Sequence, residues 1–231
     1  MKTIGLIGGM SWESTADYYR LINEGVKQAL GGLHSAKILL YNVDFADIEA
    51  LQKLGKWDEA GEILSGIGQN LESVGAEGLV LCTNTMHQVA DKIEAKISIP
   101  FLHIADATGK QLVENGIQKV GLLGTQFTME RDFYKGRLHD AFGLEVIVPE
   151  LERREEVHRV IFQELCVGEI TESSKKYFLE TISALRNAGA EAVILGCTEI
   201  GMLITQADTS VPIFDTTKIH VDAVVQWLLV R

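Results

Sequence analysis

Two residues able to exchange protons occupy matching positions in two similar stretches of the chain. The stretch 79–87 reads LVLCTNTMH, and the stretch 194–200 reads ILGCTEI. Each follows a Gly-Ala-Glu lead-in, which begins at Gly75 in the first stretch and at Gly189 in the second. Aligning the lead-ins places Thr83 opposite Cys197, 114 positions further on. A hydroxyl and a thiol can each give or take a proton, so we interpret the pair as candidate acid/base groups.

The similarity extends to other parts of the chain. IGLIG at 4–8 reappears as VGLLG at 120–124, and IPF at 99–101 reappears as VPI at 211–213. Three matched pairs in one order indicate two similar half-chains, each a small α/β unit. We assign residues 1–98 plus 209–231 to the first lobe and residues 99–208 to the second.

The elements that must position these residues are strands alternating with helices. Buried strand patterns are predicted at 2–7, 37–43, 78–82, 97–103, 119–123, 144–148, 191–195 and 211–214. Helical spacing covers most of the chain between them, including 57–74, 105–115, 128–141, 155–167, 171–188 and 217–229. This alternation predicts a parallel α/β fold. In open parallel sheets the ligand lies beyond the carboxyl ends of the strands, where this chain carries small, hydroxylated or thiol residues. Such a site suits a small polar ligand held by backbone amides at helix N-termini.

Composition and charge exclude several classes of protein. The 231 residues carry a net charge of -11 and no basic stripe, which argues against a nucleic-acid partner. There is no apolar run long enough to span a membrane, and Trp12 and Glu13 interrupt any signal-peptide core, so we expect a cytoplasmic protein. Three distant cysteines, without a CxxC pair or a His-x-x-x-His spacing, predict neither a disulfide framework nor a metal site.

Each candidate motif also has a plainer interpretation. Gly5-x-x-Gly8-Gly9 is not GxGxxG, and its glycines permit a tight turn and close approach of the backbone to a ligand. A buried structural cysteine is the common outcome for a single Cys. Cys197, however, ends a strand and precedes a helix, and we expect the helix N-terminus to lower its pKa and produce a thiolate. Cys82 is the second choice for the reactive residue of the first half, and Cys166 is expected in the core.

Two acid/base groups facing each other across a crevice between pseudo-symmetric lobes suit one kind of chemistry. A base on one face of a stereocentre removes a proton, and an acid on the other face returns one, which inverts the centre. No phosphate loop, metal cluster or pyridoxal lysine is evident. The pattern therefore predicts a cofactor-independent racemase or epimerase.

Four motifs, in this order, resemble the pyridoxal-phosphate-independent aspartate/glutamate racemase family, of the Asp/Glu/hydantoin racemase superfamily. They are GGMS at 8–11, VDF at 43–45, NTMH at 84–87 and GCTE at 196–199. The match covers essentially the whole chain and is most similar to the YgeA-type amino-acid racemases. It implies two pseudo-symmetric Rossmann-like lobes with parallel sheets, an active site between them, a homodimer, no cofactor, and catalysis by Thr83 and Cys197.

The first motif departs from the family pattern. The family has Cys-Asn-Thr where this chain has Thr83-Asn84-Thr85. The cysteine that matches Cys197 handles the proton of the L-substrate in the family, so we expect deprotonation of L-amino acids to be retained. Thr83 is a poorer base than a thiolate, so reaction from the D side should be slower. The equilibrium constant stays near unity, which requires a compensating KM.

The substrate's side chain is less narrowly predicted. Aspartate-specific members place an Arg and a Lys at positions that match Glu49 and Cys166 here, neither of which is basic. Aspartate and glutamate are the family default, and a wider range that includes homoserine is the alternative. The resemblance implies that the substrate's carboxylate and amine contact Met10, Asn84, Thr85, Thr125, Thr128 and Thr198, with Gln52 near the side chain. Glu199 is expected to orient Cys197 or to take the substrate ammonium, Thr125 and Thr128 also suit helix capping, and His87 and His103 are expected to be structural.

Other functions remain open at this stage. A maleate-isomerase-like or arylmalonate-decarboxylase-like enzyme would also use one cysteine, but it would not exchange an amino acid's α-proton with solvent. A two-lobed amino-acid binding protein would do no chemistry and would not need Cys197. A third alternative is a racemase weakened by Thr83.

Overall fold

The computed structural model describes residues 1–230, which form two compact units. Unit 1 comprises Met1–His103 and the C-terminal segment from His220, and unit 2 comprises Ile104–Ile219. The boundaries predicted from the sequence, 98/99 and 208/209, lie five and eleven residues before the boundaries of these units. The segment after Ser98 bonds to a strand of unit 1, because Leu79 N donates to Pro100 O at 2.9 Å. The last strand belongs instead to unit 2, where it pairs with its neighbour in the sheet.

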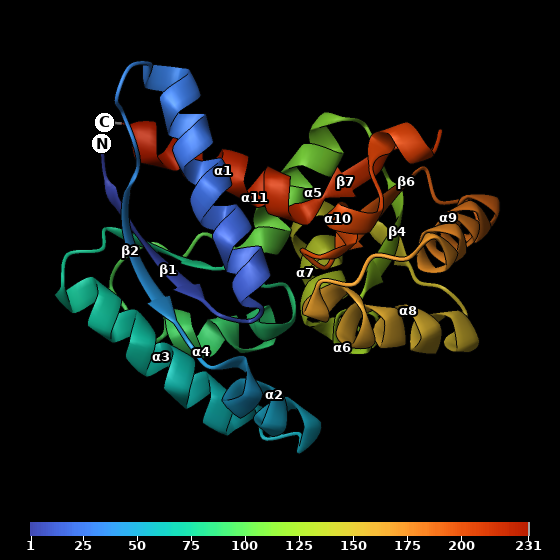
Figure 1. Cartoon of the computed structure of the whole chain (residues 1–231), viewed down its shortest axis with the longest axis horizontal. Coiled ribbons are helices and arrows are strands. Elements are labelled where there is room, and N and C mark those ends of the chain that lie inside the picture. The colour runs from blue at the N-terminus through green and yellow to red at the C-terminus, as the bar shows by residue number, and fades with distance from the viewer. Residues whose placement is uncertain (231) are drawn as a thin grey trace. The chain divides into compact units, whose positions relative to one another are not determined.

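Unit 1 is built on a three-stranded parallel sheet in the order β2-β1-β3 (Figure 1). Its strands are β1 (Thr3–Gly8), β2 (Lys37–Asn42) and β3 (Gly78–Leu81). Its helices are α1 (Trp12–Leu30), α2 (Phe45–Lys53), α3 (Trp57–Ser73) and α4 (Ala90–Glu94), with a 3-10 turn at Thr85–Val89. Helix α11 (Thr216–Leu229) begins in unit 2 and continues in unit 1 from His220.

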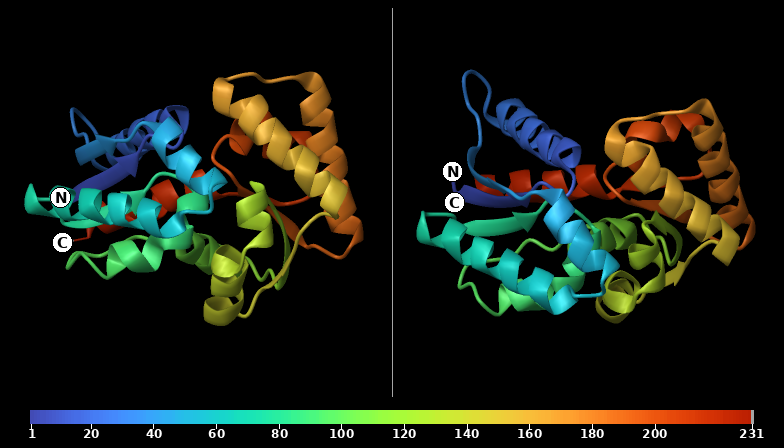
Figure 2. Two further views of the ribbon diagram at one scale, coloured as in Figure 1. Left: turned by 90° about the horizontal axis from the view of Figure 1, so that it is seen from below. Right: turned by 60° about the horizontal axis from the view of Figure 1, so that its bottom comes forward.

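Helices cover both faces of this sheet. On one face, Tyr18, Ile22 and Val26 of α1 pack with Ile4 and Leu6 of β1, joined by Val224 and Leu228 of α11. On the other face, Leu64 and Leu71 of α3 pack with Ile7 and Leu81. The right-hand view of Figure 2 shows α1 (blue) and α3 (teal) on opposite sides of the strands. The apolar residues recur at helical spacing on one side of each helix, which is the pattern of helices that bury one face.

Unit 2 is built on a four-stranded parallel sheet in the order β5-β4-β6-β7. Its strands are β4 (Lys119–Gly124), β5 (Glu145–Ile147), β6 (Ala192–Gly196) and β7 (Ile213–Asp215). Its helices are α5 (Ile104–Glu114), α6 (Gln126–Glu130), α7 (Asp132–Phe142), α8 (Leu151–Gln163), α9 (Glu172–Asn187) and α10 (Ile200–Leu203), with 3-10 turns at Leu165–Val167 and Gln206–Asp208. Residues of α6, α8, α9 and α10 form the core on one face, and residues of α5 and α7 form it on the other. Each unit is therefore a parallel sheet with helices on both faces, and the parallel α/β fold predicted from the sequence is confirmed.

The internal repeat is confirmed in the detail of its lead-in. Gly75 and Gly189 follow helices α3 and α9 with φ of 102° and 98°, a left-handed conformation that glycine adopts without strain. Two residues later, the Glu77 carboxylate accepts a bond from Thr3 N at 2.7 Å, at the start of β1. The Glu191 carboxylate likewise accepts from Lys119 N at 3.1 Å, at the start of β4. The repeated Gly-Ala-Glu thus ends a helix and anchors the first strand of its own unit.

Two expected elements differ from the prediction. The strand expected at 97–103 is only a bridge between Phe101 and Leu79, although it takes the place that β7 has in unit 2. The single helix expected at 128–141 is two helices, because Arg131 is extended, with φ of -81° and ψ of 159°. Within residues 1–230, no helix combines the length and apolarity needed to cross a membrane.

Candidate functional site

The residues predicted for the site divide evenly between the units. Unit 1 holds Met10, Gln52, Thr83, Asn84 and Thr85. Unit 2 holds Thr125, Thr128, Cys197, Thr198 and Glu199. Nine of the ten follow the end of a strand within four residues, and Gln52 lies near the C-terminal end of α2. Nine of the ten are buried, and Thr198 is half-buried.

The turn after β1 is shaped by Gly9. Its φ is 93°, and a Cβ there would lie 2.6 Å from Val43 N, so only glycine fits. Gly9 N donates to Thr15 Oγ1 at 2.8 Å, and the same hydroxyl donates to Ser11 O at 2.8 Å. Ser11 caps α1 by accepting from Ser14 N. The side chain of Met10 is buried in the apolar cluster that α3 forms with the sheet.

Thr83 lies two residues beyond β3 and is 7% exposed. Its backbone carbonyl accepts a hydrogen bond from His87 Nδ1 at 2.7 Å. The preceding carbonyl, Cys82 O, accepts from the hydroxyl of Ser14 on α1 at 3.1 Å. Side chains from two different elements therefore fix the two peptide groups on either side of the Thr83 Cα.

Cys82 is removed as a candidate reactive residue. Its side chain is fully buried among apolar residues of α1 and α11, and burial raises the pKa of its thiol far above the ordinary range. A thiol in such surroundings is inert. Alternation along the strand turns Cys82 away from the side that Thr83 occupies, as the sequence predicted.

Gln52 carries an unsatisfied polar atom. The side chain is 4% exposed, and its Nε2 donates to Met86 Sδ at 3.0 Å, next to Thr85. Its Oε1 is buried and has no hydrogen-bond partner among the residues that the structure describes. A buried acceptor without a partner is costly, so this oxygen is suited to receive a donor from a bound ligand.

In unit 2 the reactive loop depends on two glycines at neighbouring strand ends. Gly124 ends β4 and is in register with Gly196, which ends β6. A Cβ on Gly124 would lie 2.8 Å from Gly196 O, and one on Gly196 would lie 2.9 Å from Leu123 O. Only glycine lets the two strand ends approach this closely. The turns that contain Thr125 and Cys197 therefore lie side by side at the carboxyl ends of β4 and β6.

Cys197 forms a compact polar group with the residues that follow it. Its thiol donates to Glu199 Oε2 at 2.9 Å, and the Thr198 hydroxyl donates to the same oxygen at 2.7 Å. Cys197 is 8% exposed and Glu199 is 3% exposed. Burial, and then the repulsion of the Glu199 carboxylate, raise the pKa of the Cys197 thiol well above its ordinary value.

The thiolate expected at this position is therefore corrected to a thiol. The prediction relied on a helix N-terminus, but α10 has only four residues, and Glu199 stands at its N-cap. The dipole of so short a helix is weak, and an adjacent buried carboxylate opposes ionisation of the thiol. In this state Cys197 can give a proton, and Glu199 is the group that can take it.

Thr125 and Thr128 have the capping role. Thr125 Oγ1 accepts from Thr128 N at 3.3 Å at the start of α6, and the two hydroxyls lie 3.2 Å apart. The first amide of α6, Gln126 N, donates to His158 Nδ1 of α8 at 3.1 Å. Burial lowers the pKa of His158, which favours the neutral ring that can accept this bond. Contact of either threonine with a substrate stays a prediction.

Three contributions were missed from the sequence, namely those of His87, His158 and Ser14. His87 lies four residues after Thr83, the spacing at which a side chain on a helical turn can bond back to a carbonyl. That spacing was the only available signal, since the partners of His158 and Ser14 are distant in sequence. Among residues 1–230, the structure contains no group of three or more His, Cys, Asp or Glu side chains that could hold a metal ion.

Comparison with known proteins gives one consistent result. Residues 7–224 match the family model Asp/Glu/Hydantoin racemase. The broad specificity amino-acid racemase RacX of Bacillus subtilis is 22% identical over 227 residues, which cover 93% of this chain and 92% of RacX.

Solved structures agree over the full length. A protein from Yersinia pestis, provisionally described as an Asp/Glu racemase, is 54% identical to this chain in sequence. Its structure matches with a TM-score of 0.93, and the match covers 100% of both chains. An aspartate racemase homologue from Pyrococcus horikoshii is 35% identical with a TM-score of 0.85 over 99% of both chains. The chain therefore belongs to the Asp/Glu/hydantoin racemase family, whose racemases are isomerases.

Proposed function

We propose that this protein is an amino-acid racemase that works without pyridoxal phosphate, by two-base proton transfer at Cα. The observation that carries the proposal is the buried contact between Cys197 Sγ and Glu199 Oε2 at 2.9 Å. A buried thiol bonded to a carboxylate has a proton to give and a neighbour that can receive it. This is the requirement for a group that acts as acid in one direction and as base in the other.

The reaction starts from the L-substrate. Glu199 Oε2 takes the thiol proton of Cys197, and the resulting thiolate takes the proton from Cα. The Thr83 hydroxyl gives a proton to the opposite face of Cα, and the product has the D configuration. The alkoxide left on Thr83 then takes a proton from solvent, and Glu199 releases to solvent the proton that it took from Cys197. In reverse, Thr83 must act as base, and its hydroxyl is weaker in that role than the cysteine of the family, so reaction from the D side is slower.

The first test follows the α-proton directly. Purified protein is incubated in deuterated water with a panel of L- and D-amino acids, and deuterium incorporation is measured by NMR. We expect Cys197→Ser to slow exchange of L-substrates by about 10²- to 10⁴-fold, the usual contribution of a positioned acid/base group. Cys82→Ala is the matched control, because the Cys82 thiol is buried among apolar residues of α1 and α11, outside the polar group around Glu199, and this variant should stay near wild type.

Two results would count against the proposal. If no amino acid exchanged its α-proton with solvent, the proposal that the protein is an amino-acid racemase would be wrong. Equal kcat for L and D enantiomers, with no asymmetry in the solvent isotope effect, would contradict the unequal roles of Cys197 and Thr83. Thr83→Cys should raise turnover of D-substrates, because it restores the thiol that the family carries there.

Gln52 supports a substrate range beyond aspartate and glutamate. A carboxylate only accepts hydrogen bonds, so it cannot satisfy the buried Oε1 of Gln52, whereas the hydroxyl of homoserine can donate to it. We therefore include neutral polar amino acids, homoserine among them, beside the acidic pair.

The range is tested by substitution of the glutamine. Gln52→Leu should lower kcat/KM for L-homoserine by at least tenfold and that for L-aspartate by much less. Gln111→Leu is the control, because Gln111 Oε1 is also buried without a partner among the described residues but lies on α5 of unit 2. An equal loss of kcat/KM for both substrates would show that Gln52 does not recognise the substrate's side chain. The need for a reduced Cys197 also supports our placement of the reaction in the cytoplasm.

A further inference from the structure

Thr217 is a buried polar residue of unit 2 that none of the predicted site motifs contains. It lies two residues after the end of β7, in the first turn of α11, and is 5% exposed. Its Oγ1 is buried and has no hydrogen-bond partner among residues 1–230. A hydroxyl can donate one hydrogen bond and accept two. Because an unpaired buried polar group costs free energy, this hydroxyl is suited to a partner that the chain does not supply.

The topology of the sheet places Thr217 beside the reactive cysteine. Strand β7 lies next to β6 (Figure 1), and Leu195 is in register with Asp215. Cys197 and Thr217 each lie two residues further along the chain. Between them in register, the Thr216 hydroxyl donates to Leu195 O at 2.8 Å, which joins the start of α11 to the end of β6. Thr217 therefore lies at the carboxyl ends of two paired strands, where parallel sheets bind their ligands.

The other polar groups of this turn are bonded to one another. The amides of Thr217 and Lys218 donate to Asp215 Oδ1 at 3.0 and 3.3 Å, and Lys218 Nζ lies 3.1 Å from Asp215 Oδ2. Gly201 of α10 leaves room for this carboxylate, because a Cβ there would lie 2.7 Å from Asp215 Oδ2. These contacts fix the backbone of the turn, which limits where the β-branched side chain of Thr217 can point.

The charges at this end of the sheet favour a cationic group. Glu199 is 3% exposed, and its Oε2 accepts from two neutral donors, the Cys197 thiol at 2.9 Å and the Thr198 hydroxyl at 2.7 Å. Asp215 adds a second carboxylate, paired with Lys218, whose side chain is 62% exposed. A ligand's carboxylate is repelled by such surroundings, whereas an ammonium is attracted. An ammonium has three donors and no acceptor, so it needs groups that accept, such as a hydroxyl oxygen.

We propose that Thr217 Oγ1 accepts a hydrogen bond from the α-ammonium group of the substrate. This role rests on the proposed racemase function, and it names the group of the substrate that unit 2 recognises. The ammonium nitrogen is bonded directly to Cα, the atom whose proton Cys197 takes, so it lies next to the turn that Cys197 begins. By holding the nitrogen, Thr217 orients the Cα–H bond toward the sulfur.

Two ligands that differ only at the nitrogen test the contact. L-Aspartate has the α-ammonium, and succinate is the same dicarboxylate without it. The affinity of each is measured from the rise in Tm over a range of ligand concentrations. Thr217→Val should weaken binding of L-aspartate by about tenfold or more, the usual effect of a hydrogen bond to a charged group, and should respond to succinate as wild type does. Thr217→Ser keeps the hydroxyl and should retain most of the affinity for L-aspartate.

The stability of the ligand-free protein separates this role from a structural one. Valine has nearly the shape of threonine but buries no polar atom, so Thr217→Val should raise the Tm measured without ligand. Thr181→Val is the matched control, because Thr181 of α9 is also buried in unit 2 but donates its hydroxyl to Tyr177 O at 2.9 Å. This control should lower the Tm and leave the affinity for L-aspartate unchanged.

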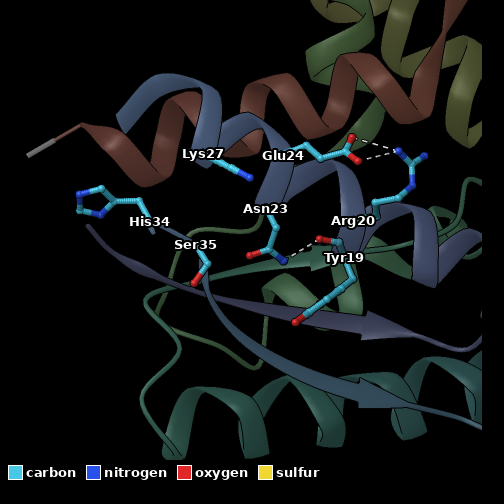
Figure 3. A pocket seen from close by; sticks show the side chains of 7 residues that line it. All are labelled: Tyr19, Arg20, Asn23, Glu24, Lys27, His34 and Ser35. Atoms are coloured by element: carbon cyan, nitrogen blue, oxygen red, sulfur yellow. Dashed lines mark hydrogen bonds and ion pairs between the residues drawn. The ribbon is translucent and has the colours of Figure 1, made fainter. Parts of the chain in front are cut away.

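Binding at a hollow on unit 1 is a further alternative. Helix α1 and the loop after it border a cavity of about 400 Å³, and Figure 3 shows the side chains that line it. Lys27 is one of them, and its ammonium can attract either dicarboxylate. Lys27→Met should leave the response to both ligands unchanged, because we place the ligand's nitrogen at Thr217 in unit 2.

Several results would overturn the assignment of Thr217. They are a wild type whose Tm does not respond to L-aspartate, an unchanged affinity of Thr217→Val for L-aspartate, an equal loss for succinate, and a loss of binding in Lys27→Met. An unchanged affinity would mean that the hydroxyl holds only a buried water. Because binding is measured apart from turnover, a protein that binds L-aspartate through Thr217 without exchanging its α-proton would contradict the racemase function alone.

Discussion

Replacement of Glu199 by glutamine should make Cys197 more reactive. In the native chain, burial and the Glu199 carboxylate together raise the pKa of this thiol. Glutamine has nearly the same shape and can still accept the thiol's hydrogen bond, but it carries no charge. Burial remains the larger cause, so the substitution removes only the repulsive part of the effect.

The size of that part follows from the contact distance. Two unit charges 2.9 Å apart repel by on the order of 5 kcal/mol at an effective dielectric constant of about 20. Relaxation and the spread of charge over the carboxylate reduce this figure. About 1.4 kcal/mol is enough to change the thiolate population tenfold. We therefore expect Glu199→Gln to speed alkylation of Cys197 by at least tenfold at neutral pH.

The assay is iodoacetamide labelling followed by mass spectrometry of the peptide that contains Cys197. A Cys166→Ser background removes the half-buried thiol that would compete for reagent, and Cys82 is too deeply buried to react in the folded chain. Labelling after denaturation gives the full signal for each variant. An alkylation rate that is unchanged or lower in Glu199→Gln would refute the assignment of Glu199 as the group that keeps the thiol protonated.

Three further outcomes are expected. Gly196→Ala should lower the free energy of unfolding by about 1–3 kcal/mol, because the new Cβ overpacks the strand end. Gly66→Ala, where no atom lies within 4 Å of the new Cβ, should raise it by about 0.5–1 kcal/mol. Urea unfolding measures both free energies, and an equal change in the two variants would contradict the steric argument. His87→Leu should lower kcat for proton exchange about tenfold at little change in KM, because it leaves the carbonyl of the candidate catalytic threonine without its donor; His87→Asn, whose amide can replace Nδ1, should recover most of the loss, and a rise in KM alone would point to another role. The Lys175 ammonium lowers the pKa of Asp208 from 3.8 to about 2, so this carboxylate contributes stability that is present above pH 3.8 and lost as the pH falls toward 2. The difference in Tm between wild type and Asp208→Asn should therefore shrink over that interval. A difference that stays constant would show that the stability is not linked to the protonation of this carboxyl.

The sequence predicted the architecture well because the repeat is carried by residues with fixed backbone roles. Gly75 and Gly189 end helices with a positive φ, and each precedes a glutamate that bonds to the start of a strand. The parallel α/β class and the presence of two similar half-chains were predicted from this repeat and from the alternation of strands with helices.

The structure differs from the sequence-based prediction where contacts between residues distant in sequence determine the local conformation. The strand expected around Phe101 makes one bridge only. The second boundary between the units lies later than predicted because β7 pairs with β6 of unit 2. The break at Arg131 has no proline or glycine to mark it, and we have no physical account of it. The protonation of Cys197 depends on the side-chain position of Glu199, which residue spacing alone does not fix.

The chain's route through unit 1 has a consequence for its synthesis. His220 of α11 accepts from the Tyr18 hydroxyl at Nδ1 (2.8 Å) and donates from Nε2 to Leu102 O (2.7 Å), so α11 is bonded to the N-terminal part of the unit. Every residue of unit 2 leaves the ribosome before the part of α11 that belongs to unit 1, which begins at His220. Unit 2 therefore has its whole sequence available before unit 1 does, whereas unit 1 keeps part of its apolar core uncovered until Val224 and Leu228 arrive. A released chain that ends at Ile219 should consequently contain a protease-resistant second half and a first half that chaperones still recognise.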